Sequence, residues 1–174
     1  MRGCIHIYCG DGKGKTTAAM GLALRAVGAG LKVLICQFLK SGVSSELNLL
    51  RNIRGIYILD GAETDKFIFQ MVDEEKQEYS YKCEQLLNNA FNLVKTEKYD
   101  MLILDELCAA ITMNMLNSDA VLTQLKNKPD ILEVVITGRD PLPQLVEMAD
   151  YVSEIKKIKH PFDQGIPARK GIEE

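Results

Sequence analysis

Short apolar runs alternate along this chain with longer segments in which apolar residues recur at helical spacing. Runs with the length and apolar content of buried strands fall at residues 4–9, 32–39, 55–59, 101–104, 131–136 and 151–155. Apolar residues recur at the spacing of a helix in residues 17–29, 46–52, 73–98, 108–116, 119–127 and 141–148, so we expect helices there. Strands that alternate with helices form right-handed βαβ units, so we expect an α/β fold with a mainly parallel sheet of about six strands.

The same pattern contains no internal repeat and no interdomain linker. We therefore expect residues 1–174 to form one domain, in which residues 156–174 are a polar C-terminal tail without periodicity. Residues 61–71 mix polar and aromatic positions and predict no regular element. Gly21, inside the first predicted helix, is expected to let that helix pack closely against the sheet.

The first apolar run ends in a glycine-rich turn that leads directly into a helical pattern. The turn consists of Gly10, Asp11, Gly12, Lys13, Gly14, Lys15, Thr16 and Thr17. A strand, a glycine-rich loop and a helix in this order predict a phosphate-binding loop, in which backbone N–H groups and the helix N-terminus hold an anion. Lys15 would reach the outer phosphates, and the Thr16 hydroxyl would bind Mg²⁺. The alternative is a flexible basic turn that only caps the helix.

The loop departs from the standard motif at one position. The motif requires a glycine five residues before Gly14, where this chain has Cys9. The first glycine is Gly10, so the loop is one residue tighter, and it carries a second lysine, Lys13. The expected fold is a three-layer P-loop domain of the RecA-like type.

Polar residues follow several of the predicted strands. Parallel α/β sheets bind ligands beyond the carboxyl ends of their strands, so the glycine-rich loop and residues 37–40, 105–106 and 137–139 are expected to define a site on one rim. Carboxylate oxygens suit Mg²⁺, so Asp105 and Glu106 are predicted to hold this ion together with Thr16. The alternative for the acidic pair is a solvated turn after a strand.

Three other charged residues are candidates for phosphate contact at the same site. Arg25 lies about two and a half turns beyond Lys15 on the first predicted helix, where it would contact a phosphate or form a surface salt bridge. Arg139 and Lys40 are also candidates for phosphate contact. No residue stands out as a general base. His6 alternates with apolar residues on a strand, so a structural role is expected for it.

Composition narrows the functional classes. The chain has 174 residues and a net charge of −3, which gives no electrostatic footprint for nucleic acid. No apolar run is long enough to span a membrane, and the N-terminus leads into a strand rather than a signal peptide, so a cytoplasmic protein is expected. The five cysteines show no CxxC spacing and mostly lie in apolar runs, which favours free thiols over disulfides or a zinc site.

These residues predict a protein that binds a magnesium–nucleoside triphosphate, and a resemblance goes further. Five segments carry it: GDGKGKTTAAMGLALRAVGAG from residue 10, QFLKSG from 37, LILDEL from 102, VVITGR from 134 and ADYVSEIKKIKHPFDQGIPARKGIE from 149. Nearly end to end, the chain resembles the ATP:corrinoid adenosyltransferases of the CobA/CobO/BtuR type. The shortened phosphate loop and the terminal segment are both typical of that family.

The resemblance implies a reaction. A reduced Co(I) corrinoid attacks the C5′ carbon of ATP, an adenosylcorrinoid forms and triphosphate leaves, so the cobalt centre is the nucleophile and no general base is needed. Lys15, Thr16 and Mg²⁺ would stabilise the triphosphate, Glu106 with nearby Asp105 would hold the ion, and Arg25 would contact a phosphate. The resemblance also implies a reversed ATP orientation in the loop, a homodimer and a flavoprotein that reduces the corrinoid.

Two departures from the family affect the site. The family uses aromatic residues, including a tryptophan, between the third strand and the long helix to displace the lower ligand of the corrinoid, and this chain has no tryptophan. Phe67 and Phe69 lie in that region, either in this role or as ordinary core residues. The chain also begins at its first strand, without the N-terminal extension that covers the site in some relatives, so site closure is expected to differ.

Three functions remain open at this stage. The first is adenosyl transfer to a corrinoid, whether a biosynthetic intermediate or salvaged cobalamin. The second is a P-loop kinase that transfers the γ-phosphate to a small molecule and produces ADP. The third is a non-catalytic module that binds ATP and a corrinoid, although the presence of Lys15, Thr16 and Glu106 argues against it.

Overall fold

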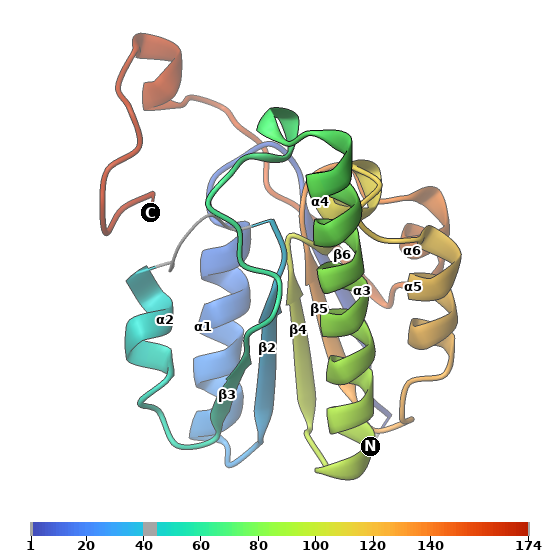
Figure 1. Cartoon of the computed structure of the whole chain (residues 1–174). Coiled ribbons are helices and arrows are strands. Elements are labelled where there is room, and N and C mark those ends of the chain that lie inside the picture. The colour runs from blue at the N-terminus through green and yellow to red at the C-terminus, as the bar shows by residue number, and fades with distance from the viewer. Residues whose placement is uncertain (1, 40–44, 174) are drawn as a thin grey trace.

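The computed structural model describes residues 2–39 and 45–173, which fold around one parallel β-sheet (Figure 1). Its strands run in the spatial order β3-β2-β4-β5-β1-β6, and every neighbouring pair is parallel. The strands are β1 (Ile5–Cys9), β2 (Val33–Gln37), β3 (Ile56–Leu59), β4 (Met101–Asp105), β5 (Glu133–Thr137) and β6 (Tyr151–Glu154). The predicted α/β fold with about six strands is confirmed, and the sheet is entirely parallel.

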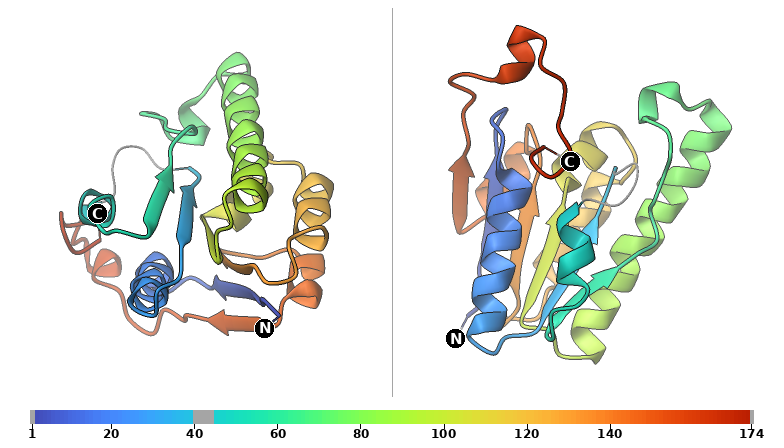
Figure 2. Two further views of the ribbon diagram at one scale, coloured as in Figure 1. Left: turned by 90° about the horizontal axis from the view of Figure 1, so that it is seen from below. Right: turned by 90° about the vertical axis from the view of Figure 1, so that its left-hand side faces the viewer.

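Helices cover both faces of this sheet, which makes three layers (Figure 2). The helices are α1 (Lys15–Gly28), α2 (Ser45–Leu50), α3 (Asp73–Thr96), α4 (Leu107–Thr112), α5 (Ser118–Lys126) and α6 (Pro143–Met148), with short 3₁₀ turns η1 (Ile68–Gln70) and η2 (Pro161–Gln164). α1 and α2 lie on one face, and α3, α4, α5 and α6 lie on the other (Figures 1 and 2). Each crossover returns the chain to the same end of the sheet, so all carboxyl ends of the strands share one rim.

The apolar core is divided by the sheet into two clusters. Alternate residues of β4 point to opposite faces: Leu102 and Leu104 join the cluster under α3, while Ile103 joins the cluster under α1. All of β4 is buried, as the continuous apolar run predicted for a strand covered on both faces. This central strand ends in Asp105, whose side chain therefore lies near the middle of the rim.

Several local predictions require correction. Gly21 does not face the sheet: it is exposed, and a Cβ built on it would meet nothing within 4 Å. The helix predicted to reach residue 116 ends at Thr112, and the chain then turns through Asn114 at φ 58°. The fifth strand begins at Glu133 because Ile131, counted as its first residue, is 65% exposed.

The remaining segments follow the sequence pattern more loosely. The segment from 61 to 71 contains only the short turn η1. Beyond β6, the described part of the tail contains η2 and rises above the carboxyl rim (Figure 1). None of the helices in the described residues has the length and hydropathy needed to cross a membrane.

Candidate active site

The glycine-rich loop joins the carboxyl end of β1 to the first turn of α1. Gly10 and Gly14 have positive φ values of 98° and 119°, and Gly14 directly precedes the helix. Lys15 is only 8% exposed, and its Nζ donates a hydrogen bond of 2.8 Å to the carbonyl oxygen of Gly12. The loop therefore closes around a largely buried cation. An anion could engage that ammonium group with little loss of solvation, because burial has already removed most of its water.

Two glycines of this loop have a role that the sequence did not predict. A Cβ on Gly10 would lie 2.5 Å from the carbonyl oxygen of Ile155, and a Cβ on Gly12 would lie 2.7 Å from the same atom. The Gly12 N–H donates to that oxygen at 2.8 Å. These glycines thus allow the segment after β6 to approach the loop. Gly14, where a Cβ would meet nothing within 4 Å, lies on an open side of the loop.

Asp105 joins three strand ends at the centre of the rim. Its carboxylate is fully buried and accepts hydrogen bonds from the Thr16 hydroxyl at 2.9 Å, the Gln37 amide at 2.9 Å and the Thr137 hydroxyl at 2.6 Å. The donors come from α1, β2 and β5. The predicted meeting of the loop with the ends of β2, β4 and β5 is thus confirmed for the described residues.

Glu106 follows Asp105 in a conformation that few side chains adopt. Its φ is 60°, in the left-handed region, and its N–H donates to the Thr137 hydroxyl at 2.9 Å. Gly138 packs closely against the start of α4, just after this turn. A Cβ at this position would lie only 2.6 Å from Cys108 Cβ, so a larger residue would not fit without a shift. The strain of a non-glycine residue at positive φ is held in place by these contacts, as is typical of functional turns. Glu106 is half-buried at the rim.

The donor atoms at this centre suit a hard divalent cation. The Thr16 hydroxyl and the carboxylate of Asp105 are hydrogen-bonded, and Glu106 is the next residue. Among the described residues, no group of three or more His, Cys, Asp or Glu side chains is arranged to hold a metal ion. A Mg²⁺ ion here would therefore take further ligands from phosphate and water, which is how this ion is commonly bound beside a phosphate loop.

The other positively charged residues that the sequence suggested for phosphate contact do not all lie near the glycine-rich loop. Arg25 lies in the last turn of α1, ten residues beyond Lys15 and about 15 Å along the helix axis, and the structure does not bring it to the loop. Arg139 is exposed, and its positive charge helps to lower the pKa of the Asp11 carboxyl in the loop. Lys40 lies outside the described residues. His6 pairs with Glu133 and stacks on Tyr151, which confirms its structural role.

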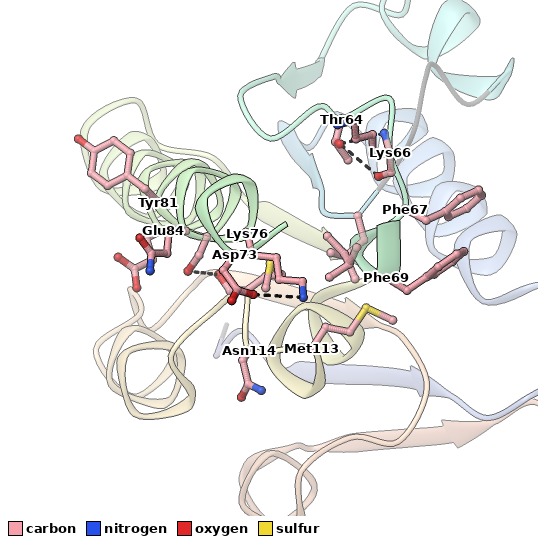
Figure 3. A pocket seen from close by; sticks show the side chains of 15 residues that line it. Thr64, Lys66, Phe67, Phe69, Asp73, Lys76, Tyr81, Glu84, Met113 and Asn114 are labelled. Atoms are coloured by element: carbon pink, nitrogen blue, oxygen red, sulfur yellow. Dashed lines mark hydrogen bonds and ion pairs between the residues drawn. The ribbon is translucent and has the colours of Figure 1, made fainter. Parts of the chain in front are cut away.

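A cavity of about 900 Å³ opens beside η1 and the first turns of α3 (Figure 3). Phe67 and Phe69 line it with their rings parallel, 5.4 Å apart between centroids at an interplanar angle of 10°. They are 58% and 81% exposed, so the core interpretation of these residues is wrong. Further apolar lining comes from Leu39, Ile68, Met113 and Met115.

Tyr79 of α3 connects this cavity to the carboxyl rim. Its hydroxyl accepts a hydrogen bond from the Leu39 N–H at 2.9 Å and donates one to the Ala62 carbonyl at 2.9 Å. Burial raises the pKa of this phenol, which therefore stays protonated. Phe38, next to Leu39, donates its N–H to the Asp105 carbonyl at 3.0 Å. Residues 37–39 thus extend from the Asp105 centre to the cavity wall. Sequence reasoning missed Tyr79 because its partners are distant in the chain.

Comparisons with known proteins agree with this arrangement. A family model described as "ATP:corrinoid adenosyltransferase BtuR/CobO/CobP" matches residues 1–173. The corrinoid adenosyltransferase of Escherichia coli K12 is 35% identical over 175 residues, which cover 99% of this chain and 86% of that protein. Those of Pseudomonas aeruginosa and Salmonella typhimurium are each 34% identical, cover 99% of this chain, and are themselves covered over 84% and 86% of their length.

Proposed function

Since the chain belongs to the ATP:corrinoid adenosyltransferase family BtuR/CobO/CobP, we propose that it transfers the 5′-deoxyadenosyl group of ATP to a Co(I) corrinoid. The cobalt electron pair attacks C5′ of ATP and forms the Co–C bond. The C5′–O bond breaks, and its electrons leave with triphosphate. The observation that carries the proposal is one rim on which a phosphate-type loop, a buried acidic centre and a large aromatic-lined cavity are joined by residues 37–39. Within this proposal, residues 1–174 act as one nucleotide-binding domain.

The glycine-rich loop is proposed to bind the triphosphate. Lys15 would exchange its hydrogen bond to the Gly12 carbonyl for one to a phosphate oxygen, which concentrates positive charge where negative charge develops on the leaving group. The N-terminus of α1, with Thr16 and Thr17, adds further donors. Lys13 in the same loop is proposed as a further phosphate contact, whereas Arg25, in the last turn of α1, lies too far from the loop for the contact expected from the sequence.

The same proposal assigns Mg²⁺ to Thr16, Asp105 and Glu106. When bound, the ion would neutralise charge on the triphosphate oxygens. Asp105 already orients the Thr16 hydroxyl and is itself oriented by Gln37 and Thr137, so the donor atoms are held in place by the protein. Glu106 at positive φ directs the chain away from the strand at this point, which keeps its carboxylate at the rim.

The cavity beside η1 is proposed to receive the corrinoid. A corrin ring is a broad, largely apolar macrocycle with polar amide side chains, which suits a cavity with stacked phenylalanines on one wall and polar groups on the others. Phe67 and Phe69 are proposed to contact one face of the ring and to displace its lower ligand, the role that the resemblance assigns to aromatic residues in this region. Closing the cavity over the reactants would exclude water from the Co(I) centre.

Two further features of the proposal come from the resemblance, and a third comes from the composition. We propose that a reduced flavoprotein supplies Co(I), that the protein acts as a homodimer and that it functions in the cytoplasm. The net charge of −3 gives no electrostatic footprint for nucleic acid.

Product identity tests the proposal against its rivals. The protein should be incubated without oxygen with MgATP and chemically reduced Co(I) corrinoid, followed by corrin absorbance and phosphate analysis. We expect a light-sensitive alkyl-cobalt spectrum and triphosphate in equal amount. Formation of ADP would instead identify a kinase, and ATP binding without a spectral change would identify a binding module.

A further inference from the structure

The segment that leaves β6 runs alongside the glycine-rich loop before it turns away. The Ile155 N–H donates to the Cys9 carbonyl at 2.8 Å, and the Gly12 N–H donates to the Ile155 carbonyl at 2.8 Å. Two residues further on, the Lys157 N–H donates to Asp11 Oδ1 at 2.9 Å. The start of the tail is therefore hydrogen-bonded to Cys9, Asp11 and Gly12 in turn. It supports the loop along one side.

Asp11 is the only side chain among these contacts, and its chemistry is unexpected for its position. A carboxylate in a loop that binds polyphosphate repels its ligand, unless its charge is engaged elsewhere. Here the hydrogen bond from the Lys157 N–H, with the nearby charges of Lys157 and Arg139, lowers the pKa of Asp11. The group is therefore ionised at neutral pH and is directed toward the tail.

Beyond Lys157 the tail folds back on itself. Lys157 Nζ pairs with Asp163 of η2 at 3.1 Å, which holds the outgoing part of the tail. Near the end, Glu173 accepts hydrogen bonds from the backbone and guanidinium of Arg169. Arg169, with a smaller contribution from the charge of Lys13, lowers the pKa of Glu173 to about 2. Figure 1 shows this segment rising above the rim, with its end returning toward α1 and α2.

We propose that Asp11 is a positioning residue for the triphosphate of ATP. By holding the Lys157 backbone it fixes the glycine-rich loop in the shape that receives phosphates, and it makes the tail and the triphosphate site one coupled unit. The inference rests on the proposed binding of ATP by this loop, and it is independent of whether the adenosyl group is transferred.

Charge and hydrogen bonding predict opposite effects at this position, which allows a sharp test. Asp11→Asn keeps the Oδ1 acceptor and loses the charge, whereas Asp11→Ala loses both. If repulsion of phosphate were the main effect of Asp11, both variants would bind MgATP more tightly than the wild type. If the hydrogen bond positions the loop, Asp11→Ala binds MgATP about fivefold more weakly than Asp11→Asn, since a typical hydrogen bond to a neutral acceptor contributes about that much.

The donor can be removed independently. Lys157→Ala and Lys157→Pro both lose the side chain, but only proline lacks the N–H that Asp11 accepts. We expect the proline variant to bind MgATP at least about tenfold more weakly than the alanine variant, because the hydrogen bond lost here is accepted by the charged Asp11 carboxylate. The double variant Asp11→Ala/Lys157→Pro should be no weaker than either single variant. Should the proline variant not fold, the Asp11 pair decides the question.

Calorimetric titration of each folded variant with MgATP gives the dissociation constants, and steady-state assays separate KM from kcat. The proposal predicts a higher KM for ATP at unchanged kcat in Asp11→Ala. It is overturned if Asp11→Ala binds MgATP as tightly as Asp11→Asn, or if Asp11→Ala only lowers the melting temperature. A wild type that binds MgATP without transferring adenosyl would contradict the proposed function and leave this test intact.

Discussion

Asp105 shows how one buried side chain can organise a site. Three donors from three different elements share its two oxygens, so the carboxylate fixes the Thr16 hydroxyl relative to the ends of β2 and β5. A buried acceptor of this kind contributes mainly through the cost of its absence, because each donor left unpaired loses about 1–3 kcal/mol of solvation. Asp105 is therefore expected to contribute both to stability and to the proposed reaction.

The substitution Asp105→Asn separates these two roles. Asparagine has nearly the same size and keeps one acceptor oxygen, but it loses the charge and brings an N–H₂ group toward donors. We expect the protein to fold with a stability loss of about 1–3 kcal/mol and the Mg²⁺-dependent activity to fall at least about a hundredfold. Denaturant unfolding and kcat/KM at several Mg²⁺ concentrations measure the two effects.

Asp100 offers a matched control at the opposite end of β4. Its carboxylate accepts the Lys32 N–H at 2.8 Å, far from the carboxyl rim. Asp100→Asn should therefore change stability modestly and leave kcat/KM near the wild-type value. Full activity in Asp105→Asn would show that the acidic centre is not part of the reaction.

The cysteines give a second prediction at the residue scale. Burial raises the pKa of the Cys83 thiol to about 11 and that of Cys108 to about 12, and it also raises the pKa of Cys9 and Cys36. Only the thiolate reacts with iodoacetamide, so these four thiols should be almost inert in the folded protein at pH 8. Cys4, which is partly exposed, should be labelled first, as peptide mass mapping can show. Rapid labelling of Cys83 or Cys108 would contradict the packing of α3 and α4.

At the scale of elements, α3 connects the sheet to the cavity through Tyr79. The hydroxyl joins Leu39, after β2, to Ala62, after β3, so a single side chain fixes two loops that border the cavity. Tyr79→Phe keeps the ring and removes both hydrogen bonds. We expect a loss of about 1–3 kcal/mol in the free energy of unfolding, together with a higher KM for the corrinoid.

Tyr81→Phe on the same helix is the control for stability, because Tyr81 is 63% exposed. It should change the free energy of unfolding by less than about 0.5 kcal/mol, as surface substitutions usually do. Equal stability of the Tyr79 and Tyr81 variants would mean that the two loops are fixed by other contacts.

Phe69 lies in the short turn η1 and Phe67 directly precedes it, and the exposure of both rings leads to a further prediction. A double change of Phe67 and Phe69 to alanine removes ring surface that is mostly in water, so it should affect the melting temperature little. It should weaken corrinoid binding at least about tenfold, because aromatic contacts to a bound ring are lost. MgATP affinity should stay unchanged.

Leu49→Ala is the matched control for η1, since Leu49 is 74% exposed on α2, on the other face of the sheet. It should leave both ligands unaffected. If the double phenylalanine variant binds corrinoid normally, the cavity beside η1 is not the corrinoid site.

These elements also show what a sequence can predict. The strands could be located from their apolar runs, and the loop from its glycines, because both signals lie in adjacent residues. The structure of residues 61–71 could not be predicted in this way, since it depends on a hydrogen bond from the Tyr79 hydroxyl, which lies on a helix further along the chain. The requirement for glycine at positions 10 and 12 could not be predicted either, because the residue that leaves no room for a Cβ there is Ile155, near the other end of the chain.

For the molecule as a whole, the parallel sheet explains why residues far apart in sequence meet at one rim. Thr16, Gln37, Asp105 and Thr137 each lie at or beyond a strand end, so the predicted βαβ pattern was enough to bring them together. The cavity was not predictable in this way, since Leu39, Phe67 and Met113 lie just outside β2, η1 and α4, in irregular segments whose course the sequence pattern does not give. The residues around Asp105 could thus be predicted from the sequence, whereas the neighbouring cavity beside η1 could not.

The attack of cobalt on C5′ of ATP is the central claim, and isotopic labelling tests it most directly. ATP labelled with ¹³C at C5′ should be incubated with the protein, Mg²⁺ and Co(I) corrinoid without oxygen, and the corrinoid product examined by ¹³C NMR. We predict that the label becomes bonded to cobalt, with one triphosphate released for each labelled corrinoid. A label that remains in ADP or in unchanged ATP, with no carbon bonded to cobalt, would contradict it.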